Sequence, residues 1–140
     1  MISHSSPEII RDLLTTTHTW AVVGCSLDPE RDSHRVAQFL QANEFRVIPV
    51  NPTATEILGE RCFPSVESIP AEIEIDVVDI FRRSEQAGPH VDEAINRHVR
   101  GVWLQLGVID PVAAIRAEEA GLAVVMDRCP AIELPKLALT

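Results

Sequence analysis

Five short apolar runs alternate with amphipathic segments along the whole chain, and this alternation constrains the fold more than any other feature. Each run is four to six residues long and is rich in valine and isoleucine, as buried parallel strands are. Strands that alternate with helices form right-handed βαβ units. The sequence therefore predicts an α/β fold, a Rossmann-like, doubly wound, parallel five-stranded sheet with helices on both faces. The expected strands are residues 20–23, 46–50, 75–80, 101–105 and 122–126.

The segments between these runs carry helix patterns. Apolar residues recur at helical spacing in residues 7–16, which begin with a proline in the first turn. Ser33 is expected to cap a helix that ends near residue 43, and Asp110-Pro111 begins a helix that Gly121 ends. Further helices are expected around residues 87–95, beginning at Ser84 or at Gly88-Pro89, and at residues 130–139, whereas residues 52–70 are loop-rich.

Composition limits the possible functions. The 140 residues are one ordinary domain's length, so residues 1–140 are expected to form a single domain. The formal net charge of −9 argues against nonspecific nucleic-acid binding, which needs a basic surface. No apolar run is long enough for a membrane span, and the first six residues lack a signal-peptide pattern, so a cytoplasmic location is expected. The cysteines and histidines are scattered, so neither a structural metal nor a disulfide framework is expected.

In such a sheet, ligands lie beyond the carboxyl ends of the strands, where the strand order switches. Gly24 permits a tight turn after the first strand, and the backbone N–H groups there and at the next helix can hold a phosphate. Ser26 stands where the second glycine of a G-x-G-x-x-G motif would be. An ordinary strand-to-helix turn therefore stays open as the alternative.

The second strand ends in Pro49-Val50-Asn51-Pro52. Nicotinamide-binding domains place an Asp or Glu about here, roughly 20 residues past the glycine turn, to hold a ribose. A carboxylate would repel a phosphorylated ribose, whereas the neutral amide of Asn51 between two prolines would not. The segment therefore predicts a nucleotide site that is not built for NAD.

Four arginines are candidate phosphate ligands. Arg31 and Arg35 follow the first strand of this acidic chain, and Arg82 and Arg83 follow the third. A solvated surface charge is the alternative for each of them. Because Arg82 comes directly after a buried strand, it is the best candidate of the four.

Aromatic and polar residues near two other strand ends are further candidates. Phe81 and Trp103 have the shape to stack on an adenine, although core packing is favoured for Trp103 because it lies inside a strand. Gln105, at the end of its strand, is expected to face the crevice.

Two cysteines are candidates for thiol chemistry. A nearby helix start can lower the thiol pKa of Cys25, but a small buried side chain is the favoured interpretation. Cys129 follows Asp127 and Arg128, whose charges oppose each other, so both interpretations stay open for it. No nucleophile–base–acid set can be recognised, so no catalytic residue is predicted.

Taken in order, these strand ends resemble those of a known family, the small stand-alone CoA-binding proteins. That family shares a Rossmann-like domain with the succinyl-CoA ligase α subunit and with related ADP-forming acyl-CoA ligases. The resemblance spans about residues 15–135. Its motifs are VVGCSLDP at residues 22–29, SHRV at 33–36, IPVNP at 48–52, LGE at 58–60, DVVDIFRR at 76–83, VWLQLG at 102–107 and MDRC at 126–129.

The resemblance implies a noncovalent site for coenzyme A or an acyl-CoA, without a catalytic centre in this chain. Asp32, where the family often has proline, adds a negative charge near the phosphate loop, and Cys25 replaces a smaller residue. By analogy, the contacts would be Gly24, Cys25 and Ser26 near the pyrophosphate, Arg31 or Arg35 at a phosphate, Pro49, Asn51 and Pro52 beside the adenosine, Phe81 and Arg82 against the nucleotide, and Gln105 and Gly107 along the pantetheine arm.

Other functions are compatible with the same fold. One alternative is an NAD(P)-linked oxidoreductase, which the absent glycine and the amide of Asn51 oppose. Another is a CoA-dependent thiol or acyl transfer enzyme that uses Cys25 or Cys129. A third is a regulatory subunit whose ligand signals metabolic state, with a protein partner that the sequence does not name.

Overall fold

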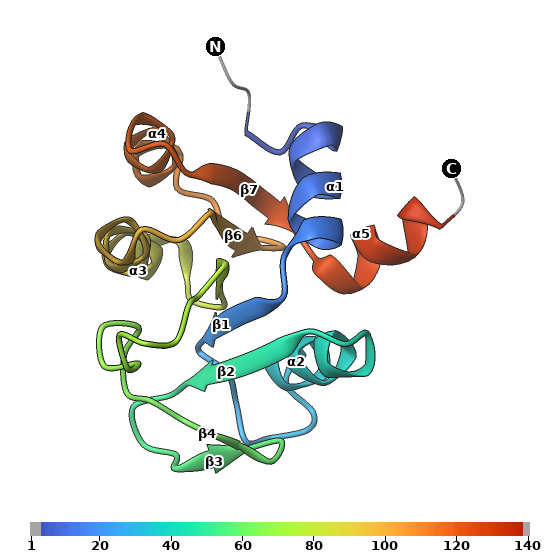
Figure 1. The fold of residues 1–140 in the computed structure, drawn as a ribbon, viewed down its shortest axis with the longest axis vertical. Helices are drawn as coiled ribbons and strands as arrows, with labels where there is room; N and C mark the ends of the chain where they lie inside the picture. Colours follow the sequence, from blue (N-terminus) through green and yellow to red (C-terminus); the bar gives the residue numbers. More distant parts are fainter. Residues whose placement is uncertain (1–3, 139–140) are drawn as a thin grey trace.

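A parallel five-stranded sheet in the order β2-β1-β5-β6-β7 forms the centre of the computed structural model, which describes residues 4–138 (Figure 1). This arrangement confirms the predicted α/β fold class. Its strands are β1 (Thr19–Val23), β2 (Arg46–Val50), β5 (Val77–Ile80), β6 (Gly101–Gln105) and β7 (Ala123–Arg128).

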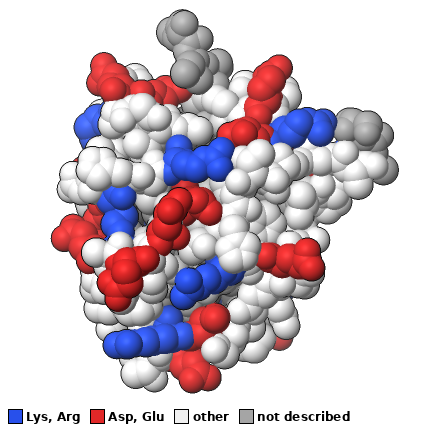
Figure 2. Space-filling view, viewed as in Figure 1, with Lys and Arg blue, Asp and Glu red and all other residues white. Residues whose placement is uncertain are grey.

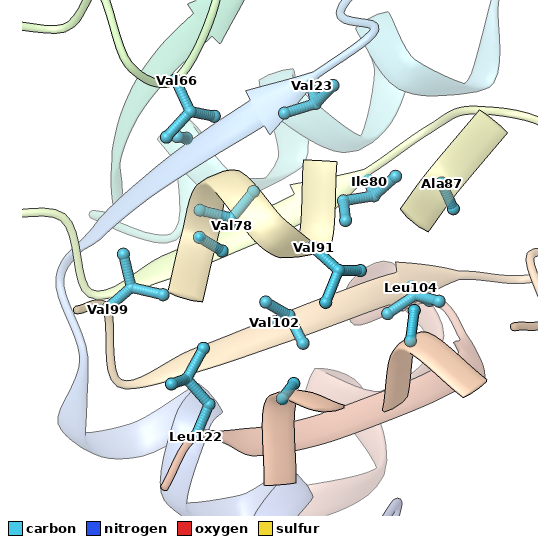
Figure 3. Packing of buried hydrophobic residues seen from close by; sticks show 14 of the residues in the cluster. Val23, Val66, Val78, Ile80, Ala87, Val91, Val99, Val102, Leu104 and Leu122 are labelled. Atoms are coloured by element: carbon cyan, nitrogen blue, oxygen red, sulfur yellow. The ribbon is translucent and has the colours of Figure 1, made fainter. Parts of the chain in front are cut away.

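Helices cover both faces of the sheet and bury its side chains in two clusters. One cluster lies under α3 and α4, and the other lies under α1, α2 and α5. In Figure 3, Val91 of α3 lies against Val102 of β6 and Ile80 of β5. The helices are α1 (Pro7–Thr16), α2 (Asp32–Ala42), α3 (Ser84–Arg97), α4 (Pro111–Glu119) and α5 (Pro130–Leu137).

Two tryptophans fill the cluster under α1, α2 and α5. Trp20 and Trp103 are fully buried, and their ring centroids are 5.5 Å apart. The indole nitrogen of Trp103 donates a hydrogen bond to the Arg128 carbonyl oxygen over 2.9 Å. Trp103 is therefore a core residue and not a ligand-stacking platform.

Several expected boundaries differ from the structure. The loop-rich segment 52–70 contains an antiparallel pair, β3 (Glu56–Ile57) and β4 (Glu60–Arg61), which is too short to give a periodic pattern. The third strand of the sheet begins at Val77 and not at residue 75. The carboxylate of Asp76 accepts the backbone N–H groups of His18 and Thr19, so this residue anchors the start of β1 instead of extending β5.

The ends of the helices also differ slightly from expectation. Helix α3 begins at Ser84, so Pro89 lies inside it. The last helix ends at Leu137, and residue 139 of the expected range lies outside the described residues. The start signal of α4 is confirmed, because the Asp110 carboxylate accepts the Ala113 N–H over 3.0 Å. The stop signal is also confirmed, because α4 ends at Glu119 and Gly121, just beyond its C-cap, has a φ of +93°.

Arg97, near the end of α3, holds the long connection before β5 in place. Its guanidinium donates to four backbone carbonyl oxygens, those of Val66, Ile69, Pro70 and Ile73, over 2.6 to 3.1 Å. Buried carbonyl groups need such partners. One side chain therefore fixes a segment that lacks regular structure.

Candidate functional site

The strand order switches between β1 and β5. Strand β1 pairs with β2 on one side and with β5 on the other, and both following loops leave from the carboxyl edge. Gly24 ends β1 with a φ of +82°, and a Cβ atom there would lie 2.3 Å from the Phe81 carbonyl oxygen. Only glycine combines this conformation with so close an approach of two loops. The crevice expected at a switch point begins here.

A cleft of about 760 Å³ opens above this point. It is lined by the loops after β1, β5 and β6 and by the first turns of α2 and α5. The candidates Cys25, Pro49, Asn51 and Pro52 are not among its lining residues. The sequence-predicted candidates that line it are Gly24, Ser26, Arg31, Arg35, Phe81, Arg82, Arg83, Gln105, Gly107 and Cys129.

The loop between β1 and α2 is held by its own hydrogen bonds. The hydroxyl of Ser33 accepts the backbone N–H of Ser26 over 3.0 Å, and the His34 ring nitrogen Nδ1 lies 2.8 Å from the Ser26 carbonyl oxygen. The prediction that Ser33 caps α2 is therefore wrong, because its side chain is used to close the loop. The N-cap residue is Arg31, which makes no side-chain capping bond. Helix α2 nevertheless directs its amino end at the cleft.

All four candidate arginines line the cleft. Arg35 forms an ion pair with Asp32, so the acid that departs from the family pattern is balanced locally. Arg82 donates to the Gln86 side chain over 3.1 Å, while its buried Nε atom has no partner among the described residues. On the face drawn in Figure 2, basic side chains lie scattered among acidic ones. Because the lining holds four arginines and two acids, Glu30 and Asp32, its formal charge is +2 in a chain of net charge −9.

Gln105 reaches the cleft through an irregularity in the sheet. The register of β6 and β7 shifts after Leu104, so that Gln105 pairs with Arg128. Its side chain is 6% exposed and lines the cleft, and its Oε1 atom has no hydrogen-bond partner in the described part of the chain. A buried acceptor without a donor costs free energy that a ligand N–H group can recover.

The neighbouring loop is fixed by Asp127. Its Oδ1 atom accepts the backbone N–H of Gly107 over 2.7 Å, and both residues have positive φ. Gly107 has open space where a Cβ atom would be.

Asn51 has a structural task that the sequence did not reveal. Its Nδ2 atom donates to the Cys25 carbonyl oxygen over 2.9 Å, and its Oδ1 atom accepts the backbone N–H groups of Thr53 and Ala54. An amide both donates and accepts, whereas a carboxylate only accepts. Asn51 therefore links the loop after β2 to the loop after β1. This structural role is sufficient to explain why an amide, and not a carboxylate, stands at this position.

The cysteines separate clearly by position. Cys25 is fully buried, and burial, helped by Cys62 and Asp79, raises the pKa of its thiol to about 12. A thiol with so high a pKa is a poor nucleophile. Cys129 instead lines the cleft at the start of α5. Among the described residues, no group of three or more His, Cys, Asp or Glu side chains is placed to hold a metal ion.

Asp79 is an unusual buried group that the sequence analysis did not single out. It lies in the middle of the sheet, opposite Val22 and Trp103, and is fully buried. Neither carboxyl oxygen has a hydrogen-bond partner in residues 4–138, and burial raises the pKa of this carboxyl well above its usual value. The available signal was an acid inside an otherwise apolar run, Val77–Ile80.

Several known proteins are similar to this chain in sequence and in architecture. Residues 18–135 match the model of a family described as a CoA binding domain. The chain is 37% identical to the uncharacterised protein YneT of Bacillus subtilis over 120 residues, which are 86% of this chain and 87% of YneT. It is also 32% identical over 62 residues to an ADP-forming acetate–CoA ligase of Archaeoglobus fulgidus, and these are 43% of this chain and 9% of the ligase.

A solved structure agrees over nearly the full length. The crystal structure of Prb, a protein redesigned for binding, matches with a TM-score of 0.91 and 40% identity, and the match covers 99% of this chain and 96% of that one. None of the described helices is both long and apolar enough to cross a membrane. With the family match over most of its length, the chain belongs to the CoA-binding domain family.

Proposed function

We propose that the chain binds coenzyme A or an acyl-CoA noncovalently in the cleft above the β1–β5 switch point. The observation that carries this proposal is the gathering of four arginines around the Gly24 turn of an acidic chain. Coenzyme A carries a pyrophosphate and a 3′-phosphate. Arginine binds phosphate oxygens through charge-assisted hydrogen bonds. The amino end of a helix also favours a negatively charged group such as phosphate.

Two buried polar atoms of the cleft that lack hydrogen-bond partners among the described residues support the choice of coenzyme A as the ligand. The Nε atom of Arg82 is a buried donor without a partner, and the Oε1 atom of Gln105 is a buried acceptor without one. A phosphate oxygen satisfies the first, and an amide N–H of the pantetheine arm satisfies the second. Phe81, next to Arg82 in the sequence, is half-buried and lines the same cleft, where its ring can pack against the nucleotide. One ligand thus supplies both missing partners.

The same cleft favours a binding role over an enzymatic one. Of the two candidate nucleophiles, Cys25 is buried, has a thiol pKa raised by that burial, and lies outside the lining. Cys129 lies in the lining, which contains no histidine among the described residues that could serve as its base. Asn51, at the position where a nicotinamide site has an acid, uses its amide to hold two loops. We therefore propose a module that holds its ligand without transforming it.

Coenzyme A is expected to stabilise the folded protein by about 2.7 kcal/mol at a concentration 100 times its Kd, because it binds only the folded state. Thermal unfolding with and without ligand measures this. NADPH and 3′-dephospho-CoA are the comparison ligands. No shift at millimolar coenzyme A would contradict the proposal, and a shift with NADPH alone would point to the oxidoreductase alternative.

An Arg82→Gln variant is expected to bind coenzyme A about tenfold more weakly, since one charge-assisted hydrogen bond is lost. Titration calorimetry measures the Kd. Arg46→Gln is the matched control, because Arg46 is exposed at the amino end of β2, opposite the cleft. Equal losses in both variants would mean that only net charge matters and that Arg82 makes no specific contact.

A further inference from the structure

The residues that line the cleft are divided by charge along the sheet. Every charged residue in the lining follows β1 or β5, namely Glu30, Arg31, Asp32, Arg35, Arg82 and Arg83. The lining contributed after β6 and β7 contains no charged residue among the described residues. Because β6 lies next to β5 and away from β1 in the sheet, the cleft has a basic end after β1 and β5 and an uncharged end formed by the loop after β6 and the first turn of α5.

The uncharged end carries two large exposed apolar side chains. Leu106, in the loop after β6, is 57% exposed, and Ile132, in the first turn of α5, is 45% exposed. Both line the cleft, together with the smaller Val108, Cys129 and Ala131. Leaving leucine and isoleucine in water forgoes the free energy that their burial would provide. Their place beside a ligand cleft indicates that part of the ligand covers them.

We infer that the ligand is an acyl-CoA whose short aliphatic acyl group lies over Leu106 and Ile132. This inference rests on the proposed function. With its phosphates at the arginines, coenzyme A directs its pantetheine arm past Gln105 toward β7, and its sulfur reaches the uncharged end. Free coenzyme A ends there in a thiol that covers little apolar surface. The aliphatic chain of a thioester covers the side chains of Leu106 and Ile132 and lies beside no charged residue of the lining.

The affinity is therefore expected to rise with the length of the acyl chain. Full burial of one methylene group strengthens binding about fourfold. Leu106 and Ile132 are exposed and cover only one side of the acyl chain, so we expect half of that free energy. Half corresponds to about twofold in affinity per methylene. Hexanoyl-CoA, with four methylenes more than acetyl-CoA, should then bind about 16-fold more tightly. The heat capacity change of binding should also become more negative with chain length.

Titration calorimetry with free, acetyl-, butyryl- and hexanoyl-CoA tests the inference on the full chain. In a Leu106→Ser, Ile132→Ser double variant, the ratio of hexanoyl-CoA to acetyl-CoA affinity should fall toward one. Ile115→Ser is the matched control, because Ile115 is an equally exposed apolar residue of α4, 54% exposed, that does not line the cleft. It should keep the wild-type ratio.

The outcomes separate the two proposals. Equal binding of all four ligands, or tightest binding of free coenzyme A, overturns the acyl-CoA inference and leaves the CoA site in place. A ratio that persists in the double variant, with its circular dichroism unchanged, overturns the assignment to Leu106 and Ile132. Binding of none of the four ligands to the folded protein overturns the proposed function and the inference with it.

Discussion

Replacing Gly24 with alanine is expected to lower the free energy of unfolding by about 3 kcal/mol. Part of the loss comes from the φ of +82°, which side chains with a Cβ atom rarely adopt. The rest comes from the new Cβ atom, which would lie 2.3 Å from the Phe81 carbonyl oxygen. That oxygen cannot withdraw easily, because the Phe81 N–H is bonded to the Val23 carbonyl oxygen and the Gly24 N–H to that of Val50.

Chemical denaturation of the Gly24→Ala variant measures the loss. Gly59→Ala separates the two causes, because Gly59 has a φ of +76° but nothing within 4 Å of an added Cβ atom. The control is expected to lose only the cost of the left-handed conformation, about 1 kcal/mol. If both variants lose the same amount, the contact with Phe81 does not contribute and the loops can separate.

Local patterns were sufficient to predict the five strands of the main sheet and the five helices, but not the short pair β3 and β4. The bounds of α1, β2 and β6 agree with those expected, because each segment carries its own signal: a proline in the first helical turn, or a run of buried residues between polar ends. The topology then brings the strand ends together, which is why most candidate ligand contacts line one cleft. The parts of the site that depend on strand order were predictable.

Contacts between distant segments were not predictable from those patterns. Asn51 bonds the carbonyl of Cys25, 26 residues away, and Ser33 closes a loop instead of capping its helix. The bulge after Leu104, which places Gln105, depends on how β7 pairs with β6. Each of these side chains is polar and could serve either the protein or a ligand, and only its neighbours in space decide which.

Asp79 should make the protein less stable as the pH rises. Below about pH 4, the carboxyl is protonated in both the folded and the unfolded chain. Above that, the unfolded chain ionises while the folded chain, with its raised pKa, stays neutral. The unfolded state then binds fewer protons, so the free energy of unfolding falls by about 1.4 kcal/mol per pH unit until the pH reaches the raised pKa.

An Asp79→Asn variant has no such proton and should not show this loss. Its free energy of unfolding minus that of the wild type should therefore rise by about 1.4 kcal/mol per unit between pH 5 and the raised pKa of Asp79, as measured by urea unfolding at each pH. Glu72→Gln, which removes the same charge from an exposed position, should run parallel to the wild type. A constant difference between the Asp79→Asn variant and the wild type from pH 5 to 7 would mean that Asp79 is ionised in the fold. An ionised carboxylate would then require a partner beside Val22 and Trp103, since burying an unpaired charge there costs far more than burying a neutral acid.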